Sequence, residues 1–287
     1  MESRLEKSTV TGERLVYHYT SAAGAFGIIS SGKIWCPSVY YMNDRQEGIY
    51  ARSVAHQCAN ILLKASAPEV RTAFTVELQR QLERTDDAGA FAVCFSEAGD
   101  LLSQWRGYGG NGGFSLGFGI EALSQAASRI GMQVKKVLYK NDEQIVALLP
   151  IVKSFMSSFD FSILGNREKI GDIFLPLARA IAAESAWMKD AAFSEEREWR
   201  LCALPYSNDN AEVSYILRSG LIVPTVVFDL YVGQKSIGKR ELRDHCLRNY
   251  FVGPGSDRHQ QLFAISGLLR KMNWYTEGGG TSRAPLK

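Results

Sequence analysis

The residues best suited to chemistry lie in the alternating run Glu196–Leu204. Alternation of apolar and polar residues is typical of a half-buried strand. Glu196, Glu198 and Arg200 would then project from one face, with the apolar residues between them on the other. One interpretation is a solvated face whose charges pair with one another. The other is a catalytic carboxylate, oriented by a neighbouring charge, for acid–base chemistry or for stabilising a cation.

A second candidate is His18, which stands between Tyr17 and Tyr19 in another alternating run. On a strand the two tyrosines point to one side and the histidine to the other. The imidazole either packs in the core and binds a backbone carbonyl, or it donates to a hydroxyl group of a ligand beside Thr20. The sequence leaves both interpretations open.

Trp105 and Tyr108 precede a glycine loop, Gly109–Gly113, which a strand follows. Because they are three residues apart, the two aromatic side chains would share one face of a helical turn. They either pack in the core or form a platform for a flat heterocycle. The loop is not a P-loop, because it lacks the Lys-Ser/Thr pair and precedes a strand. We expect a flexible loop whose backbone can approach a ligand closely.

Three carboxylates define a metal-dependent alternative. Asp44 and Glu47 have the spacing of a capping box at a helix start, and Glu97 ends a predicted strand. A nuclease-like hydrolase would use these acids on a metal ion. Their places at element ends have a simpler structural explanation, and we expect no metal.

The composition is that of an ordinary globular protein, with 287 residues, 46% apolar and 22% charged. A net charge of +3 is too small to require a nucleic acid or a membrane as partner. The charged first residues do not resemble a signal peptide, and no apolar run approaches the roughly 20 residues of a spanning helix. The cysteines form no C-x-x-C pair, which predicts reduced thiols rather than a zinc site or a disulfide framework. We therefore expect a cytoplasmic protein without a membrane partner. The cysteines are Cys36, Cys58, Cys94, Cys202 and Cys246.

The elements that must position these residues mix strands and helices. Strands are predicted at 15–19, 34–41, 91–97, 114–118, 133–139, 196–204, 215–217, 221–228, 230–232, 250–252 and 274–276. Helices are predicted from Ser21 to Gly32 and over 46–57, 58–83 with a new start at Pro68, 142–160, 166–190, 239–249 and 258–272. The pattern indicates one α+β domain at 14–276, with a helical insert at about 142–190. A flexible arm at 1–13 precedes it, and a mobile tail at 277–287 follows it.

Several separated blocks resemble a large bacterial family of domains of unknown function. They are Y-H-Y-T (17–20), I-I-S-S-G (28–32), N-D-R-Q-E (43–47), C-F-S-E (94–97) with Trp105 and Tyr108 downstream, F-S-E-E-R-E-W-R (193–200) and S-R-A-P (282–285). They cover most of the chain in order. The opening block is also similar to the first strand of ADP-ribosyltransferases such as the DNA-modifying toxin DarT. There, an aromatic-His-x-Thr strand leads into a helix that ends near Ser-Gly.

The second resemblance implies an ADP-ribosyltransferase-like fold, a split antiparallel β core with flanking helices. It implies that His18 and Thr20 bind ribose hydroxyls of NAD. Glu198, second in a Glu-x-Glu pair with Glu196, would stabilise the oxocarbenium ion as nicotinamide leaves. A fixed carboxylate stabilises that developing charge more than it stabilises the substrate. An aromatic ring would stack on the nicotinamide, with Tyr108, Trp105 and Tyr40 as candidates, and Tyr19, Ser96 and Arg200 would complete the NAD site.

The resemblance implies an NAD-dependent ADP-ribosyltransferase or NAD glycohydrolase, acting as a toxin or in antiviral defence. Its acceptor would be nucleic acid, protein or water, and a toxic activity would imply a neutralising partner protein. The competing hypothesis is a non-catalytic module that senses a nucleotide or a phage component. The catalytic hypothesis requires His18 and Glu198 to line one cleft, whereas a wide separation would favour the binding module.

Overall fold

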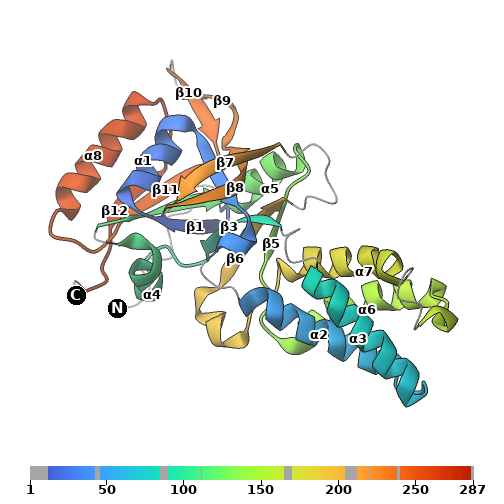
Figure 1. Ribbon diagram of the computed structural model, residues 1–287. Helices are drawn as coiled ribbons and strands as arrows, with labels where there is room; N and C mark the ends of the chain where they lie inside the picture. Colours follow the sequence, from blue (N-terminus) through green and yellow to red (C-terminus); the bar gives the residue numbers. More distant parts are fainter. Residues whose placement is uncertain are drawn as a thin grey trace.

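The computed structural model describes residues 12–42, 46–84, 90–110, 112–164, 170–203, 212–218, 220–237 and 240–285. The predictions for Asn43, Asp44 and the side chain of Glu47 therefore lie outside the described residues, as do the first residues of the helix predicted at 166–190 and most of the arm at 1–13. Figure 1 shows a β-rich body beside a lobe of helices.

A mixed sheet of seven strands forms the centre of the β-rich body, in the order β12-β11-β4-β1-β3-β6-β5. Neighbouring strands are antiparallel except for β11 and β12. The strands are β1 (Leu15–Thr20), β3 (Phe91–Ser96), β4 (Phe114–Gly119), β5 (Gln133–Lys136), β6 (Glu198–Ala203), β11 (Leu247–Val252) and β12 (Gly278–Thr281). The predicted α+β class is confirmed.

A smaller sheet packs against one face of the central sheet. It comprises β2 (Lys33–Pro37), β8 (Leu221–Asp229) and β7 (Val213–Arg218) in that order. A separate two-stranded sheet is formed by β9 (Tyr231–Ile237) and β10 (Arg240–His245). Ile34 and Phe228 of the smaller sheet lie in the same buried cluster as Val93, Phe95 and Leu201 of the central one. Inward-facing apolar residues of two sheets thus form the main core.

Helix α1 (Ala22–Ser31) has the ends that the sequence predicts. The Ser21 hydroxyl accepts a hydrogen bond from the Gly24 N–H at 3.2 Å. Gly32 ends the helix with a φ of 71°, and its N–H donates to the Ile28 carbonyl at 2.8 Å. The other elements around the sheets are η1 (Val39–Tyr41), α4 (Leu102–Gln104), the π-helical turn η3 (Trp105–Gly109), α5 (Ile120–Ser128), η5 (Ala191–Glu196) and α8 (Arg258–Lys271).

The helical lobe is built from two helix pairs that come from separate parts of the chain (Figure 1). Helices α2 (Gln46–Leu62) and α3 (Pro68–Arg84) lie between β2 and β3; α6 (Asn141–Ser158) and α7 (Ile170–Ser185) lie between β5 and β6, with η4 (Phe161–Ile163) joining them. Phe74 of α3 and Phe174 of α7 meet in its core, with ring centroids 4.9 Å apart. The insert predicted at 142–190 is thus only half of this lobe, because helical periodicity does not reveal which helices pack together. None of the helices in the ranges given above is long and apolar enough to span a membrane.

The C-terminal part differs most from the predictions. The helix predicted at 239–249 is instead β10 and the start of β11, because pairing with β9 and β4 overrides local helix propensity. Residues 278–281, predicted within a mobile tail, form β12 and pair with β11, whereas the strand predicted at 274–276 is not formed. At Gly279 a Cβ would meet a Tyr250 ring atom at 2.2 Å, so glycine permits this close pairing.

Candidate active site

Strands β1 and β3 pair at Tyr17 opposite Ser96 and carry no further ladder pair within the described residues. The continuation of β1, His18–Thr20, pairs with β4 on its other side. A cavity of about 530 Å³ lies where β1 and β3 cease to pair, within the size range of ligand sites. It is lined from the central sheet by His18, Tyr19, Thr20, Cys94, Phe95, Glu198 and Arg200.

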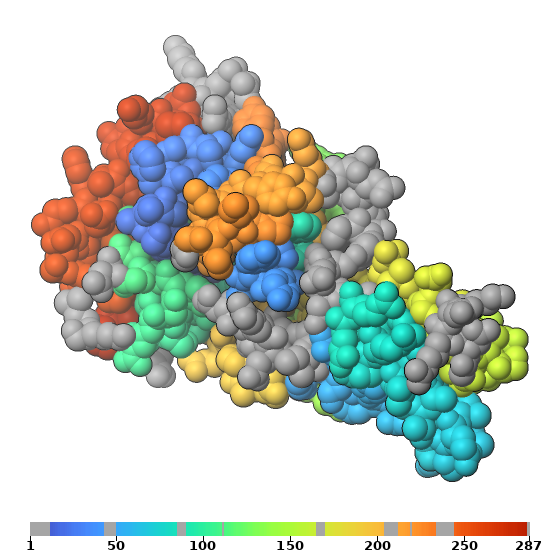
Figure 2. Space-filling model, viewed as in Figure 1, coloured from blue at the N-terminus to red at the C-terminus, as the bar shows by residue number. Residues whose placement is uncertain are grey.

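The opposite wall of the cavity comes from α1 and the smaller sheet. Helix α1 lines it with Ala23, Gly24 and Gly27, and β2 and β7 add Trp35 and Ile216. A Cβ added at Gly27 would meet no heavy atom within 4 Å. The cavity is therefore open here because α1 presents little side-chain volume. In Figure 2, α1 (blue) and the β7–β8 hairpin (orange) lie side by side on this face.

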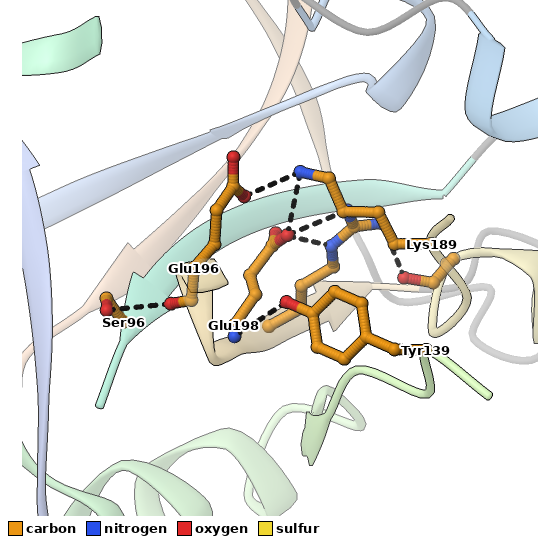
Figure 3. A network of polar contacts seen from close by, with 7 residues as sticks. Ser96, Tyr139, Lys189, Glu196 and Glu198 are labelled. Carbon is orange, nitrogen blue, oxygen red and sulfur yellow. Dashed lines mark hydrogen bonds and ion pairs between the residues drawn. The ribbon is translucent and has the colours of Figure 1, made fainter. Parts of the chain in front are cut away.

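Four charged side chains form a connected cluster on the cavity wall (Figure 3). Arg200 Nε lies 2.7 Å from Oε1 of Glu198, and its Nη2 lies 3.2 Å from Oε2. Lys189 Nζ lies 2.7 Å from Oε2 of Glu196 and 3.1 Å from Oε2 of Glu198. With two cations and two anions, the cluster has a formal charge of zero.

The alternation of β6 brings Glu198 and Arg200 to the same face, as predicted, but this face is not solvated. Glu198 is 3% exposed and Arg200 is 1% exposed. Arg200 Nη1 donates to the Ala186 carbonyl at 2.8 Å, and the Glu198 N–H donates to the Tyr139 hydroxyl at 2.9 Å. Buried charges need such partners, so the solvated-face interpretation is wrong for these two residues.

Glu198 is held as a carboxylate. Burial alone would raise its pKa, but the charge and hydrogen bonds of Arg200 and the charge of Lys189 outweigh burial and lower the pKa to about 2. At neutral pH, Glu198 therefore carries no proton to donate. It is suited to stabilising a positive charge that develops nearby.

His18 has features of both interpretations that the sequence left open. Its Nδ1 lies 3.0 Å from the Cys94 carbonyl oxygen, which can only accept, so Nδ1 carries the hydrogen. Burial lowers the pKa of His18, and the charge of Arg218 lowers it further. In the neutral ring Nε2 is then an acceptor. The predicted donor to a ligand hydroxyl is thus corrected to an acceptor from one.

The two candidate aromatic residues on η3 have different surroundings. Trp105 is 3% exposed, donates from Nε1 to Asp100 at 2.7 Å and packs edge-on against Tyr19. Tyr108 is 41% exposed and lines the cavity, and burial of its hydroxyl raises its pKa to about 12. Tyr40 and Trp105 are not among the lining residues. Of the candidates, Tyr108 alone is placed to stack on a ligand in this cavity.

Two other residues that were predicted at the NAD site, Tyr19 and Ser96, hold the backbone around the cavity. The Tyr19 hydroxyl donates to the Ala98 carbonyl at 2.7 Å and accepts from the Leu101 N–H at 2.8 Å. Ser96 Oγ donates to the Glu196 carbonyl at 2.8 Å (Figure 3). Tyr19 lines the cavity and Ser96 does not. Ser96 therefore positions Glu196 rather than contacting a ligand there.

Lys189 is a site residue that the sequence analysis missed. The predicted helix at 166–190 ends at Ser185, and the following residues turn toward β6. There, the Leu138 N–H donates to the Trp187 carbonyl at 2.8 Å, and the Lys189 N–H donates to the Leu138 carbonyl at 3.1 Å. These bonds deliver Lys189 to the cavity. A lysine at the end of a helical pattern carries no signal of this role.

Of the three carboxylates of the metal-dependent alternative, only the Glu97 side chain lies within the described residues. No group of three or more His, Cys, Asp or Glu side chains there is placed to hold a metal ion. Glu97 Oε1 accepts from Lys136 Nζ at 2.7 Å and from Trp199 Nε1 at 2.9 Å. This carboxylate is thus engaged in holding β5 to β6, in agreement with its structural explanation.

The fold and site define an α+β protein with a buried ionic cluster on the wall of a cavity. Its residues 104–201 match the family model described as "Protein of unknown function (DUF2971)". The match confirms the predicted resemblance to a family of domains of unknown function over this stretch, which contains Tyr108, Lys189, Glu196, Glu198 and Arg200. Neither the curated proteins nor the solved structures contain a significant match, and the resemblance to ADP-ribosyltransferases is not confirmed.

Proposed function

We propose that this chain is an NAD-consuming enzyme, an ADP-ribosyltransferase or an NAD glycohydrolase. The observation that carries the proposal is that His18 and Glu198, which are distant in the sequence, line one cavity. The catalytic hypothesis requires this arrangement. A separation of the two residues would have left the carboxylate without a ribose-binding partner.

The proposal includes an ADP-ribosyltransferase-like fold. Its support is the limited pairing of β1 with β3, which divides the central sheet into β12-β11-β4-β1 and β3-β6-β5. A split antiparallel core has its cleft at such a division. His18 belongs to one half and Glu198 to the other.

In the proposed reaction, the bond between the nicotinamide nitrogen and the ribose breaks, and nicotinamide leaves with the electron pair. Positive charge develops on the ribose, and ionised Glu198 stabilises it. His18 Nε2 accepts a hydrogen bond from a ribose hydroxyl, and the Tyr108 ring stacks on the nicotinamide. Water or the nucleophile of a nucleic acid or protein then forms the new bond to the ribose and releases its proton to solvent.

The biological setting that follows is a toxin or an antiviral effector, because consumption of NAD harms the cell in which it occurs. Such an activity calls for a neutralising partner protein. The acceptor decides the class: water makes the protein a glycohydrolase, and a macromolecular nucleophile makes it a transferase.

The test is nicotinamide release from NAD by the full chain, with and without single-stranded DNA, RNA and a protein mixture. Glu198→Gln is expected to slow release by roughly 100-fold or more while NAD binding, measured by calorimetry, persists. Glu97→Gln is the matched control, since it removes a neighbouring carboxylate that does not line the cavity. Full activity in Glu198→Gln would contradict the proposal.

The second candidate is a non-catalytic module that binds a nucleotide or a phage component and presents the helical lobe to a partner. The observation that favours it is that Arg200 and Lys189 already hold both carboxylate oxygens of Glu198. NAD binding without nicotinamide release, under all of the above conditions, would support this module over the enzyme.

A further inference from the structure

The ionic cluster contains two cations that differ in how firmly they are held. Arg200 binds both oxygens of Glu198 and also donates to the Ala186 carbonyl. Its side chain is 1% exposed. Arg200 therefore has no room to leave Glu198.

Lys189 is shared between two carboxylates. Its Nζ lies closer to Glu196, at 2.7 Å, than to Glu198, at 3.1 Å, and 5.0 Å above the centre of the Phe193 ring. The Glu196 side chain is 21% exposed, whereas that of Glu198 is 4% exposed. Lys189 can thus release Glu198 and keep a carboxylate and an aromatic ring as partners.

We propose that Lys189 is a positioning residue for Glu198, and that it yields this carboxylate to a flat organic cation by shifting onto Glu196. The inference rests on the proposed function, because the nicotinamide ring of NAD is such a cation. Without a ligand, Lys189 completes the charge balance of Glu198. With the ligand bound, the positive ring stacks on the Tyr108 ring near the place that Lys189 has left, and the ribose attached to the ring faces Glu198.

Because the inference depends on the formal charge of the cluster, it predicts how substitutions change the affinity for a cation relative to a neutral ring. Lys189→Met changes the formal charge of the four residues from zero to −1, so a cation should bind more tightly and a neutral ring equally well. Glu196→Gln changes it to +1 and removes the alternative partner of Lys189, so a cation should bind more weakly. Lys189→Arg keeps the charge.

The experiment compares 1-methylnicotinamide, a cation, with neutral nicotinamide of nearly the same shape. Calorimetry on the full chain gives the ratio of their affinities, and steady-state kinetics give kcat and KM for NAD. We expect the ratio to rise about tenfold in Lys189→Met and to fall about tenfold in Glu196→Gln. We expect kcat to fall about tenfold in Lys189→Met, because Glu198 loses its second anchor, and to recover in Lys189→Arg.

A lower KM with a lower kcat in Lys189→Met separates positioning from a merely structural role, which would raise KM and lower kcat together. An unchanged affinity ratio in Lys189→Met and Glu196→Gln would overturn the inference, and so would wild-type protein that binds neither probe. If Lys189→Met does not fold, the affinity ratio measured with Glu196→Gln still tests the inference. Shifts in the ratio without nicotinamide release would overturn the proposed enzyme and leave the cation site standing.

Discussion

His18 Nδ1 lies 3.0 Å from the carbonyl oxygen of Cys94, and this hydrogen bond joins β1 to β3 beyond their last ladder pair. A backbone ladder continued here would place the two strands about 5 Å apart and close the sheet. The longer reach of an imidazole connects the strands and leaves space for a cavity. His18 therefore holds β1 and β3 together at the site and also lines the cavity.

The ionic cluster predicts a loss of stability in acid. The pKa of Glu198 is 4.5 when free and about 2 in the folded chain, so its ionised form contributes stability above pH 4.5. This contribution, about 3 kcal/mol, is lost progressively as the pH falls from 4.5 to about 2, so most of the loss has occurred by pH 3. Urea unfolding between pH 7 and pH 3 should show a shallower decline for Glu198→Gln than for wild type. Parallel declines would contradict the buried ion pair.

The pairing of Glu198 with Arg200 predicts strong coupling in a double-mutant cycle. Arg200→Met should cost about 3–5 kcal/mol, because it leaves a buried carboxylate short of its main partner. Adding Glu198→Gln removes that charge and should restore part of the stability. The measurement is urea unfolding of both single variants and the double variant; additive losses would show that the two side chains act independently.

Gly27 predicts that the cavity can be filled without unfolding the protein. Gly27→Leu should raise stability by about 0.5–1 kcal/mol, because leucine is the better helix former, and should weaken NAD binding by about tenfold or more. Gly267→Leu on α8 is the matched control, since a Cβ there also meets no heavy atom within 4 Å and the residue does not line the cavity. Calorimetry and thermal unfolding measure both effects. Undiminished NAD binding by Gly27→Leu would place the ligand elsewhere.

The contrast between Tyr108 and Trp105 predicts opposite effects of truncation. Tyr108→Ala should weaken NAD binding about tenfold and change stability by less than about 1 kcal/mol, because the ring is half-exposed. Trp105→Ala should cost about 3–5 kcal/mol, because it empties a buried site. Tyr40→Ala, on an exposed ring outside the cavity, serves as the control for lost aromatic surface. Equal NAD affinity in the Tyr108 and Tyr40 variants would remove the stacking role.

Much of the fold could be predicted where the signal is local. The alternation of β1 and β6, the Ser21 cap and the left-handed Gly32 each depend on a few neighbouring residues. The buried stripe of α7, from Ile170 to Ile181, follows from its periodicity. The prediction of a helix at 239–249 was wrong, because pairing with β9 and β4 stabilises β10 and β11 as strands. Local helix propensity carries no sign of either pairing, and β4 is distant in the sequence.

The site divides in the same way. His18, Glu198 and Arg200 could be singled out because strand alternation places them, and Tyr108 could be named as one of several aromatic candidates. The sequence did not show that Trp105 would donate to Asp100 and pack against Tyr19, because these contacts depend on the course of the loop that follows β3. Lys189 was missed because its position depends on backbone bonds to Leu138, a residue in a different segment.

The two helix pairs of the lobe bury their apolar faces against each other. Phe74 of α3 packs against Phe174 of α7, and the Cys58 thiol of α2 donates to the Ile145 carbonyl of α6 at 3.8 Å. Deleting either pair alone would uncover the apolar face of the other and invite aggregation. A shortened version of this protein must therefore lose both insertions together. The lobe is one packing unit that the chain encodes in two places.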